Sequence, residues 1–137
     1  MAVLLDSGFL FASLNSSEAE HHATIVVLKT IREQIILPVP AITEVAYLLA
    51  RDIDSETAAD FIASLATTDL TLETPTASDY SRCAELLKQY ADSKLDFVDA
   101  LITAMAERLG VTRLLTLDRR DFQLVRPKHC DSFELLP

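Results

Sequence analysis

The sequence predicts an α/β sandwich built on a mainly parallel sheet. Short apolar segments typical of buried strands alternate along the chain with longer segments in which apolar residues recur at helical spacing. This alternation is typical of proteins in which helices connect parallel strands. The 137 residues are 50% hydrophobic and include only two glycines and five prolines, which is the composition of a compact protein. We therefore expect a single domain over residues 1–137.

Each predicted strand is a short apolar run with a clear end. AVLLD at 2–6 is followed by SGF, which we expect to form a turn, and IILPV at 35–39 leads into a second proline. The last long strand, VTRLLTLD at 111–118, alternates apolar and polar residues after a stop at Gly110. Two shorter segments complete the sheet, LTLE at 70–73 and an edge strand within DSFELLP at 131–137.

The helices between these strands carry recognisable start signals. Ser17 and Glu20 stand three residues apart, as do Thr76 and Asp79, which is the spacing of a capping box. Thr43 is placed to cap the helix that follows the second strand. The predicted helices cover about residues 18–34, 44–53, 55–66, 76–92 and 99–109.

Charge and composition exclude several classes of protein. The chain has 12 basic and 21 acidic residues, a net charge of -9, which excludes a protein that coats nucleic acid through a general positive field. No apolar run approaches the roughly 20 residues of a membrane span. Cys83 and Cys130 are far apart, and the first residues lack the features of a signal peptide. We therefore expect a reduced, cytoplasmic protein that is not associated with a membrane.

Four acidic residues are expected at one edge of the predicted sheet. Asp6 and Asp118 end strands, whereas Glu44 and Asp99 open helices, and functional sites of such sheets lie beyond the carboxyl ends of the strands. Clustered carboxylates need protons or a cation, and oxygen ligands without His or Cys suit Mg²⁺ or Mn²⁺. Taken singly, Asp118 could be a turn residue and Glu44 could stabilise a helix N-terminus. Together they indicate metal-dependent hydrolysis of a phosphodiester.

Several neighbouring residues have two open interpretations. Asp96 stands three residues before Asp99, so one of the two could be a helix cap instead of a metal ligand. Ser7 is the hydroxyl residue beside the first strand's aspartate and is a possible additional site residue. Arg119 and Arg120 are either solvated surface charges or a pair that holds an RNA phosphate backbone.

With these residues in place, the sequence resembles a PIN domain of the VapC toxin type. The resemblance covers nearly the whole chain and rests on LLDSG, PAITEVAYLL, DFVDALITAMAERLG and RLLTLDRRDF, in this order. It implies a three-layer α/β/α sandwich and a Mg²⁺ or Mn²⁺ site held by Asp6, Glu44, Asp99 and Asp118. It also implies an endoribonuclease that acts as the toxin of a toxin–antitoxin pair, is restrained by a cognate antitoxin and forms a homodimer.

Three alternatives belong to other functional classes. A phosphatase of the haloacid-dehalogenase type needs a second Asp two residues after the first, where this chain has Gly8. A phosphoacceptor receiver domain needs paired acids after the first strand and an Asp after the third, but LLDSG supplies one acid and LTLETP supplies no Asp. The third alternative is a PIN-like domain that only binds partners, because an intact set of metal ligands is necessary for nuclease activity without being sufficient. Metal-dependent RNA cleavage distinguishes it from the enzyme.

Overall fold

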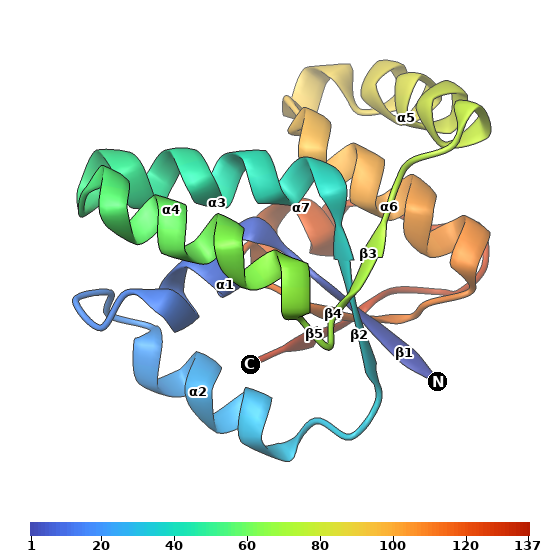
Figure 1. The fold of residues 1–137 in the computed structure, drawn as a ribbon. Helices are drawn as coiled ribbons and strands as arrows, with labels where there is room; N and C mark the ends of the chain where they lie inside the picture. Colours follow the sequence, from blue (N-terminus) through green and yellow to red (C-terminus); the bar gives the residue numbers. More distant parts are fainter.

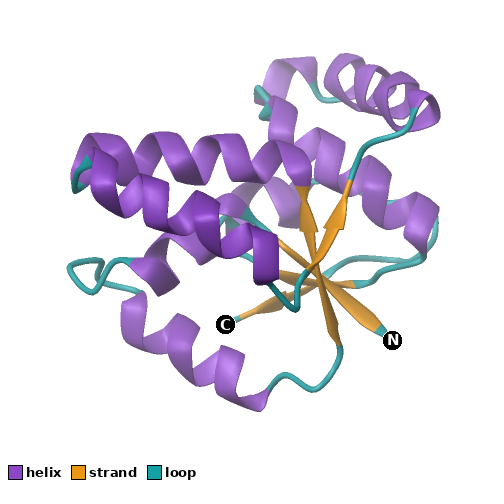
Figure 2. Cartoon of the chain, in the orientation of Figure 1, coloured by secondary structure: helices purple, strands orange, loops and turns teal.

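Five strands form one fully parallel sheet in the computed structural model, which describes residues 1–137 (Figure 1 and Figure 2). The order across the sheet is β3-β2-β1-β4-β5. Strands β2 and β3 therefore lie on one side of β1, and β4 and β5 lie on the other. Every neighbouring pair of strands is parallel, as the sequence predicts. The strands are β1 (Ala2–Leu5), β2 (Gln34–Pro38), β3 (Thr71–Glu73), β4 (Arg113–Leu115) and β5 (Glu134–Leu136).

Helices cover both faces of this sheet and give the molecule the three layers that the resemblance implies. Successive residues of a strand point to opposite faces, and in β1 Leu4 packs into one core while Val3 and Leu5 pack into the other. Figure 1 shows α1 and α2 on the opposite side of the sheet from α5 and α6. The first core is covered by α5 (Ala77–Gln89), α6 (Phe97–Leu109) and α7 (Arg119–Leu124), and the second by α1 (Ser7–Leu14), α2 (His21–Thr30), α3 (Val39–Asp52) and α4 (Ser55–Ser64). None of these helices has both the length and the apolar character needed to cross a membrane.

Two helix ends follow the predicted signals. At the start of α5, the Thr76 hydroxyl accepts a hydrogen bond from the Asp79 N–H, and the Asp79 carboxylate accepts one from the Thr76 N–H, which is the predicted capping box. At the end of α6, Gly110 adopts the left-handed conformation with φ 69°. Glycine takes this conformation without the steric cost that a Cβ atom would add.

The predicted turn at SGF after β1 is wrong, because Ser7 begins helix α1. The residues of this helix, SGFLFASL, are almost all apolar or small, and Phe9, Leu10 and Phe11 are buried. A helix that is buried on most sides lacks the polar face that makes helical periodicity visible in a sequence. The start of α1 directly after β1 determines the position of Asp6, which stands between the two elements.

Helix α2 is shorter than the helix predicted at 18–34. It covers His21–Thr30, and Glu20 stands at its N-cap without a side-chain hydrogen bond, so the predicted capping box with Ser17 does not form. The Asn15 side chain instead accepts a hydrogen bond from the Ser17 N–H. This local bond favours a turn between α1 and α2 over an earlier helix start.

Helix α3 begins at Val39, earlier than the start predicted near Thr43. Pro40 occupies the first turn of the helix, where its fixed φ suits the helix and its missing N–H leaves no hydrogen bond unmade. Glu44 therefore lies in the second turn of α3 and not at its N-terminus. Of the two prolines at the end of the predicted strand, Pro38 ends β2 as expected, whereas Pro40 belongs to the helix.

The strand predicted at 111–118 is also shorter, and a helix follows it. β4 ends at Leu115, and the Asp118 side chain accepts a hydrogen bond of 3.1 Å from the Asp121 N–H, which caps α7. Asp118 therefore begins a short helix and does not end a strand. The edge strand predicted within 131–137 is β5.

Candidate metal centre

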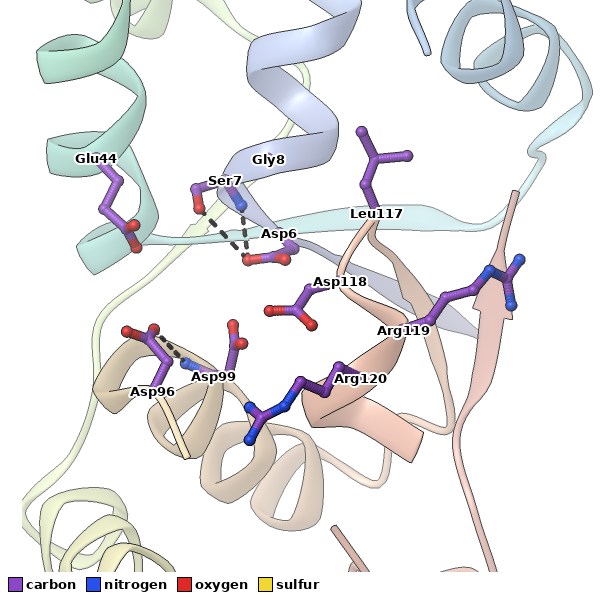
Figure 3. Close-up of a pocket in the computed structure, with 10 residues that line it drawn as sticks. All are labelled: Asp6, Ser7, Gly8, Glu44, Asp96, Asp99, Leu117, Asp118, Arg119 and Arg120. Atoms are coloured by element: carbon purple, nitrogen blue, oxygen red, sulfur yellow. Dashed lines mark hydrogen bonds between the residues drawn. The ribbon is translucent and has the colours of Figure 1, made fainter. Parts of the chain in front are cut away.

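All eight side chains singled out in the sequence line one cleft at the carboxyl ends of β1 and β4. The cleft has a volume of about 640 Å³, and Figure 3 shows its five carboxylates pointing toward the same space. Gly8 and Leu117 are its other lining residues. The eight are Asp6, Ser7, Glu44, Asp96, Asp99, Asp118, Arg119 and Arg120.

Asp6 is held by partners on both of its carboxylate oxygens. Its backbone N–H donates to the Leu115 carbonyl at 2.9 Å, which extends the pairing of β1 with β4 by one residue. Oδ1 accepts a hydrogen bond of 2.8 Å from the Ser7 N–H, so Asp6 caps α1, and Oδ2 accepts one of 2.7 Å from the Thr116 hydroxyl. These two bonds fix the carboxylate, which is only 5% exposed, at the floor of the cleft.

Thr116 is a site residue that the sequence analysis missed. Its hydroxyl donates to Asp6 and also accepts a hydrogen bond of 2.9 Å from the Asp118 N–H, so one buried side chain links two of the acidic positions. The only signal in the sequence is a threonine two residues before an aspartate near the end of a strand. That signal is weak, because the role of Thr116 depends on β4 lying beside β1.

The buried carboxylates favour protonation. Burial, a hydrogen bond with Asp118 and the negative charge of Asp6 together raise the pKa of Asp99 to about 11. Burial also raises the pKa of Asp6, although the hydrogen bonds from Thr116 and Ser7 oppose the shift. Carboxyl oxygens of Asp99, Asp118 and Asp121 all lie within 4.8 Å of one another. In the absence of a cation, the Asp99 carboxyl group therefore retains its proton at neutral pH.

Glu44 brings an unpaired oxygen to this cluster. Its Oε1 atom is buried and has no hydrogen-bond partner, and burial together with the charges of Asp96 and Asp6 raises its pKa. An unsatisfied buried acceptor is costly unless a ligand or ion completes it. The donor atoms in the cleft are carboxylate and hydroxyl oxygens without a histidine or a thiol, and such atoms fit a hard divalent cation such as Mg²⁺ or Mn²⁺.

Asp96 is the N-cap of α6, and this helix begins at Phe97, two residues before the predicted start at Asp99. Its Oδ2 atom accepts hydrogen bonds from the N–H groups of Val98, at 3.1 Å, and Asp99, at 3.4 Å. The capping interpretation of the Asp96 and Asp99 spacing therefore describes Asp96 correctly. The same carboxylate also lines the cleft (Figure 3).

The two arginines beside the cleft differ in their partners. Arg120 forms an ion pair with Asp121, a buried residue of α7 that the sequence analysis did not single out. Arg119 donates to a backbone oxygen of Pro137, and it forms no ion pair with an Asp or Glu side chain. Figure 3 shows the Arg119 side chain extending away from the carboxylate cluster. Of the two arginines that line the cleft, only Arg119 has no acidic side chain paired with it.

Known proteins resemble this chain over almost its full length. Ribonuclease VapC26 from Mycobacterium tuberculosis is 24% identical over 135 residues, which cover 98% of this chain and all of the relative. The crystal structure of VapC20 from the same species, described as a Sarcin-Ricin loop cleaving toxin, has a TM-score of 0.85 at 20% identity and covers 98% of this chain and 99% of its own.

Two further structures with the same fold come from complexes. A toxin-antitoxin complex from Klebsiella pneumoniae contains a chain with a TM-score of 0.66 at 20% identity, covering 90% of this chain and 92% of that one. VapBC2 from Rickettsia felis, bound to a DNA fragment from its promoter, contains a chain with a TM-score of 0.72 at 14% identity. The match covers 98% of this chain and 97% of that one. These similarities independently support the α/β/α arrangement described above.

The family is established by a match to the sequence model of the PIN domain. This match runs from residue 3 to residue 126 and so includes all of the acidic residues that line the cleft. It also spans four of the five strands, from β1 to β4. This chain belongs to the PIN domain family.

Proposed function

We propose that this chain is a metal-dependent endoribonuclease and the toxin of a toxin–antitoxin pair. The observation that carries this proposal is the convergence of five carboxylates on one cleft, with a buried Glu44 oxygen that has no partner. Membership of the PIN family and the similarity to a protein named as a VapC ribonuclease support the same chemistry. Family membership argues against the alternative of an unrelated α/β phosphatase. The remaining alternative, a PIN domain that only binds partners, is tested by RNA cleavage.

We infer that Asp6, Glu44, Asp99 and Asp118 hold Mg²⁺ or Mn²⁺. A divalent cation bound there would polarise the attacking water and neutralise charge that develops on the phosphodiester. The hydrogen bonds from Thr116 and from the amide after Asp6 orient one ligand in advance. Glu44 offers an oxygen with no competing bond, and Asp99 releases its proton when it becomes a ligand.

The neighbouring side chains have supporting roles in this proposal. Asp96 lines the same cleft as the cap of α6, and Ser7 lines it beside Asp6, whose carboxylate accepts from the Ser7 N–H. We infer that Arg119 binds a phosphate of the RNA backbone, because it lines the cleft and no Asp or Glu side chain pairs with its guanidinium group. Arg120 is less suited to this role, because Asp121 already pairs with its guanidinium group.

Arg119→Ala is expected to weaken RNA binding and to reduce its salt dependence. Loss of one phosphate contact should lower the slope of log affinity against log salt concentration by about 0.7 for single-stranded RNA. Binding is best measured by fluorescence anisotropy in an Asp99→Asn background, which prevents cleavage. Lys29→Ala on α2 is the matched control, since it removes the same charge from a residue outside the cleft and should leave the slope unchanged. Equal salt-dependence slopes for the Asp99→Asn parent and for the Arg119→Ala and Lys29→Ala variants made in it would rule out a phosphate contact at Arg119.

The proposed partner is a cognate antitoxin with a basic segment. A partner that inserts a cationic side chain among the carboxylates would neutralise the cleft and block access of RNA. Two proteins of the same fold were solved as parts of toxin-antitoxin assemblies, which supports this choice of partner. The homodimer and the cytoplasmic location expected from the sequence stay predictions.

Expression of this chain alone is expected to slow bacterial growth, and co-expression of an adjacent small reading frame should restore it. Growth curves after induction give the measurement, with the Asp99→Asn variant as the control that should be harmless. Soluble, folded wild-type protein that leaves growth unchanged would contradict a toxin function. The structural neighbour described as a Sarcin-Ricin loop cleaving toxin makes this loop the first substrate to test.

A further inference from the structure

Helices α5 and α6 each have an aspartate three residues after the N-cap residue, but the carboxylate of this aspartate has different partners in the two helices. In α5, the N-cap Thr76 and the acid three residues later, Asp79, form a reciprocal pair, and the Asp79 carboxylate accepts a hydrogen bond of 2.9 Å from the Thr76 N–H. In α6, Asp96 is the N-cap and Asp99 holds the equivalent position. The first half of the pair is present, because Asp96 accepts from the Asp99 N–H. The second half is absent.

The N–H of Asp96 instead donates to a residue from a different helix. Its acceptor is Oδ2 of Asp121 in α7, at 3.2 Å. Asp121 is 3% exposed and is fixed in turn by the bond from its own N–H to the Asp118 carboxylate and by the ion pair with Arg120. The Asp99 carboxylate therefore has no capping role and stays among the carboxylates of the cleft (Figure 3).

We propose that Asp121 is a positioning residue that takes up the Asp96 amide and so frees the Asp99 carboxylate for the cleft. A backbone N–H at a partly buried helix start needs an acceptor. Without Asp121, the acceptor that the capping-box position offers is the Asp99 carboxylate, which would close a capping box of the kind seen in α5. That movement would turn one carboxylate away from the others. This inference rests on the proposed function, in which Asp99 binds a divalent cation.

Two variants at position 121 separate positioning from direct metal binding. Asp121→Asn keeps an oxygen that can accept from the Asp96 N–H, whereas Asp121→Ala removes it. We expect Mn²⁺ affinity, measured by titration calorimetry, to fall about 10- to 100-fold in Asp121→Ala and to stay close to the wild-type value in Asp121→Asn. The matched control is Asp79→Ala, which removes the buried acid that accepts from the N-cap amide of α5 and does not line the cleft. It should lower thermal stability without changing Mn²⁺ affinity.

A second readout needs no metal. Through-hydrogen-bond NMR coupling identifies the carboxyl group that accepts from the Asp96 amide. We expect this coupling to involve the carboxyl carbon of Asp121 in the wild type and that of Asp99 in Asp121→Ala. A wild-type amide already coupled to Asp99 would overturn the inference, even if the metal site itself is correct.

The calorimetric outcomes are equally decisive. Equal loss of Mn²⁺ affinity in Asp121→Asn and Asp121→Ala would indicate that Asp121 is itself a ligand and would overturn the positioning role. Wild-type Mn²⁺ affinity in Asp121→Ala would show that Asp121 has no role in metal binding and would also overturn the inference. Failure of the proposed function looks different, because Mn²⁺ would then bind neither the wild type nor any variant while the NMR coupling still moved from Asp121 to Asp99.

Discussion

Replacement of Asp99 by asparagine is expected to lower the rate of RNA cleavage by orders of magnitude and to stabilise the metal-free protein. Asparagine keeps the shape of the side chain but removes one negative charge from the proposed metal site. It also resembles the protonated carboxyl that the cleft favours, since burial and the neighbouring acids raise the pKa of Asp99 to about 11. Cleavage assays and thermal unfolding on the same preparations test both halves of this expectation.

The stabilisation should depend on pH in a defined direction. The folded state of wild-type protein holds the Asp99 proton up to a pH near 11, whereas the unfolded state loses it near the ordinary value of 3.8. Between these values the folded state binds more protons, so the stability of the wild type falls as the pH rises. Asp99→Asn lacks this dependence. At about pH 8 in the presence of a chelator, the free energy of unfolding of Asp99→Asn should exceed that of the wild type by at least about 1 kcal/mol. This difference should shrink toward pH 4.

Asp96 provides the control for this experiment. Asp96→Asn should retain most activity and stability because asparagine caps a helix about as well as aspartate, and Asp96→Ala should lose about 1 kcal/mol of stability. An active Asp99→Asn beside an inactive Asp96→Asn would reverse the roles assigned to the two residues. Loss of activity in both would mean that Asp96 also reaches the metal, directly or through water.

Addition of Mn²⁺ or Mg²⁺ is expected to raise the melting temperature on the order of 10 °C. Binding to the folded state alone contributes about 2.7 kcal/mol when the metal is present at a hundredfold excess over its Kd, and for a chain of this size that corresponds to a shift of this order. The cation has this effect because it compensates the repulsion among the carboxylates and completes the unpaired oxygen of Glu44. Differential scanning fluorimetry with and without a chelator gives the measurement.

The metal effect should be larger at about pH 8 than at about pH 5. The pKa values of Asp6, Glu44 and Asp99 are all raised, and each ligand must lose its proton to bind the cation. The quadruple variant with Asn at the three aspartates and Gln at Glu44 should show no shift. A wild-type protein that does not respond to millimolar metal would indicate that the acidic cluster is only structural.

The parallel sheet could be predicted because its signals are local. In β1, β2 and β4 each apolar run is buried on both faces of the sheet, and this leaves a short, continuous hydrophobic segment in the sequence. The capping box of Thr76 and Asp79 and the stop at Gly110 are likewise local and are found where predicted. Helix α1 was missed because its burial on most sides removes the polar face that marks a helix.

The site could be predicted in part for the same reason. The acidic residues at the ends of strands and starts of helices could be placed at one edge because parallel strands bring their carboxyl ends together. The roles of Thr116 and Asp121 could not be found in this way. They arise from contacts between elements distant in sequence, 110 residues apart for Thr116 with Asp6 and 25 for Asp121 with Asp96.

The most direct test of the proposed function is the mapping of RNA ends after treatment of total cellular RNA with the purified protein. New ends at defined positions should appear with wild-type protein and Mg²⁺ or Mn²⁺, and should be absent both with a chelator and with Asp99→Asn. Cleavage that persists in the chelator or in Asp99→Asn would contradict a metal site at this cleft. Absence of any cleavage by folded wild-type protein that binds Mn²⁺ would contradict the nuclease itself and favour a PIN domain that only binds partners.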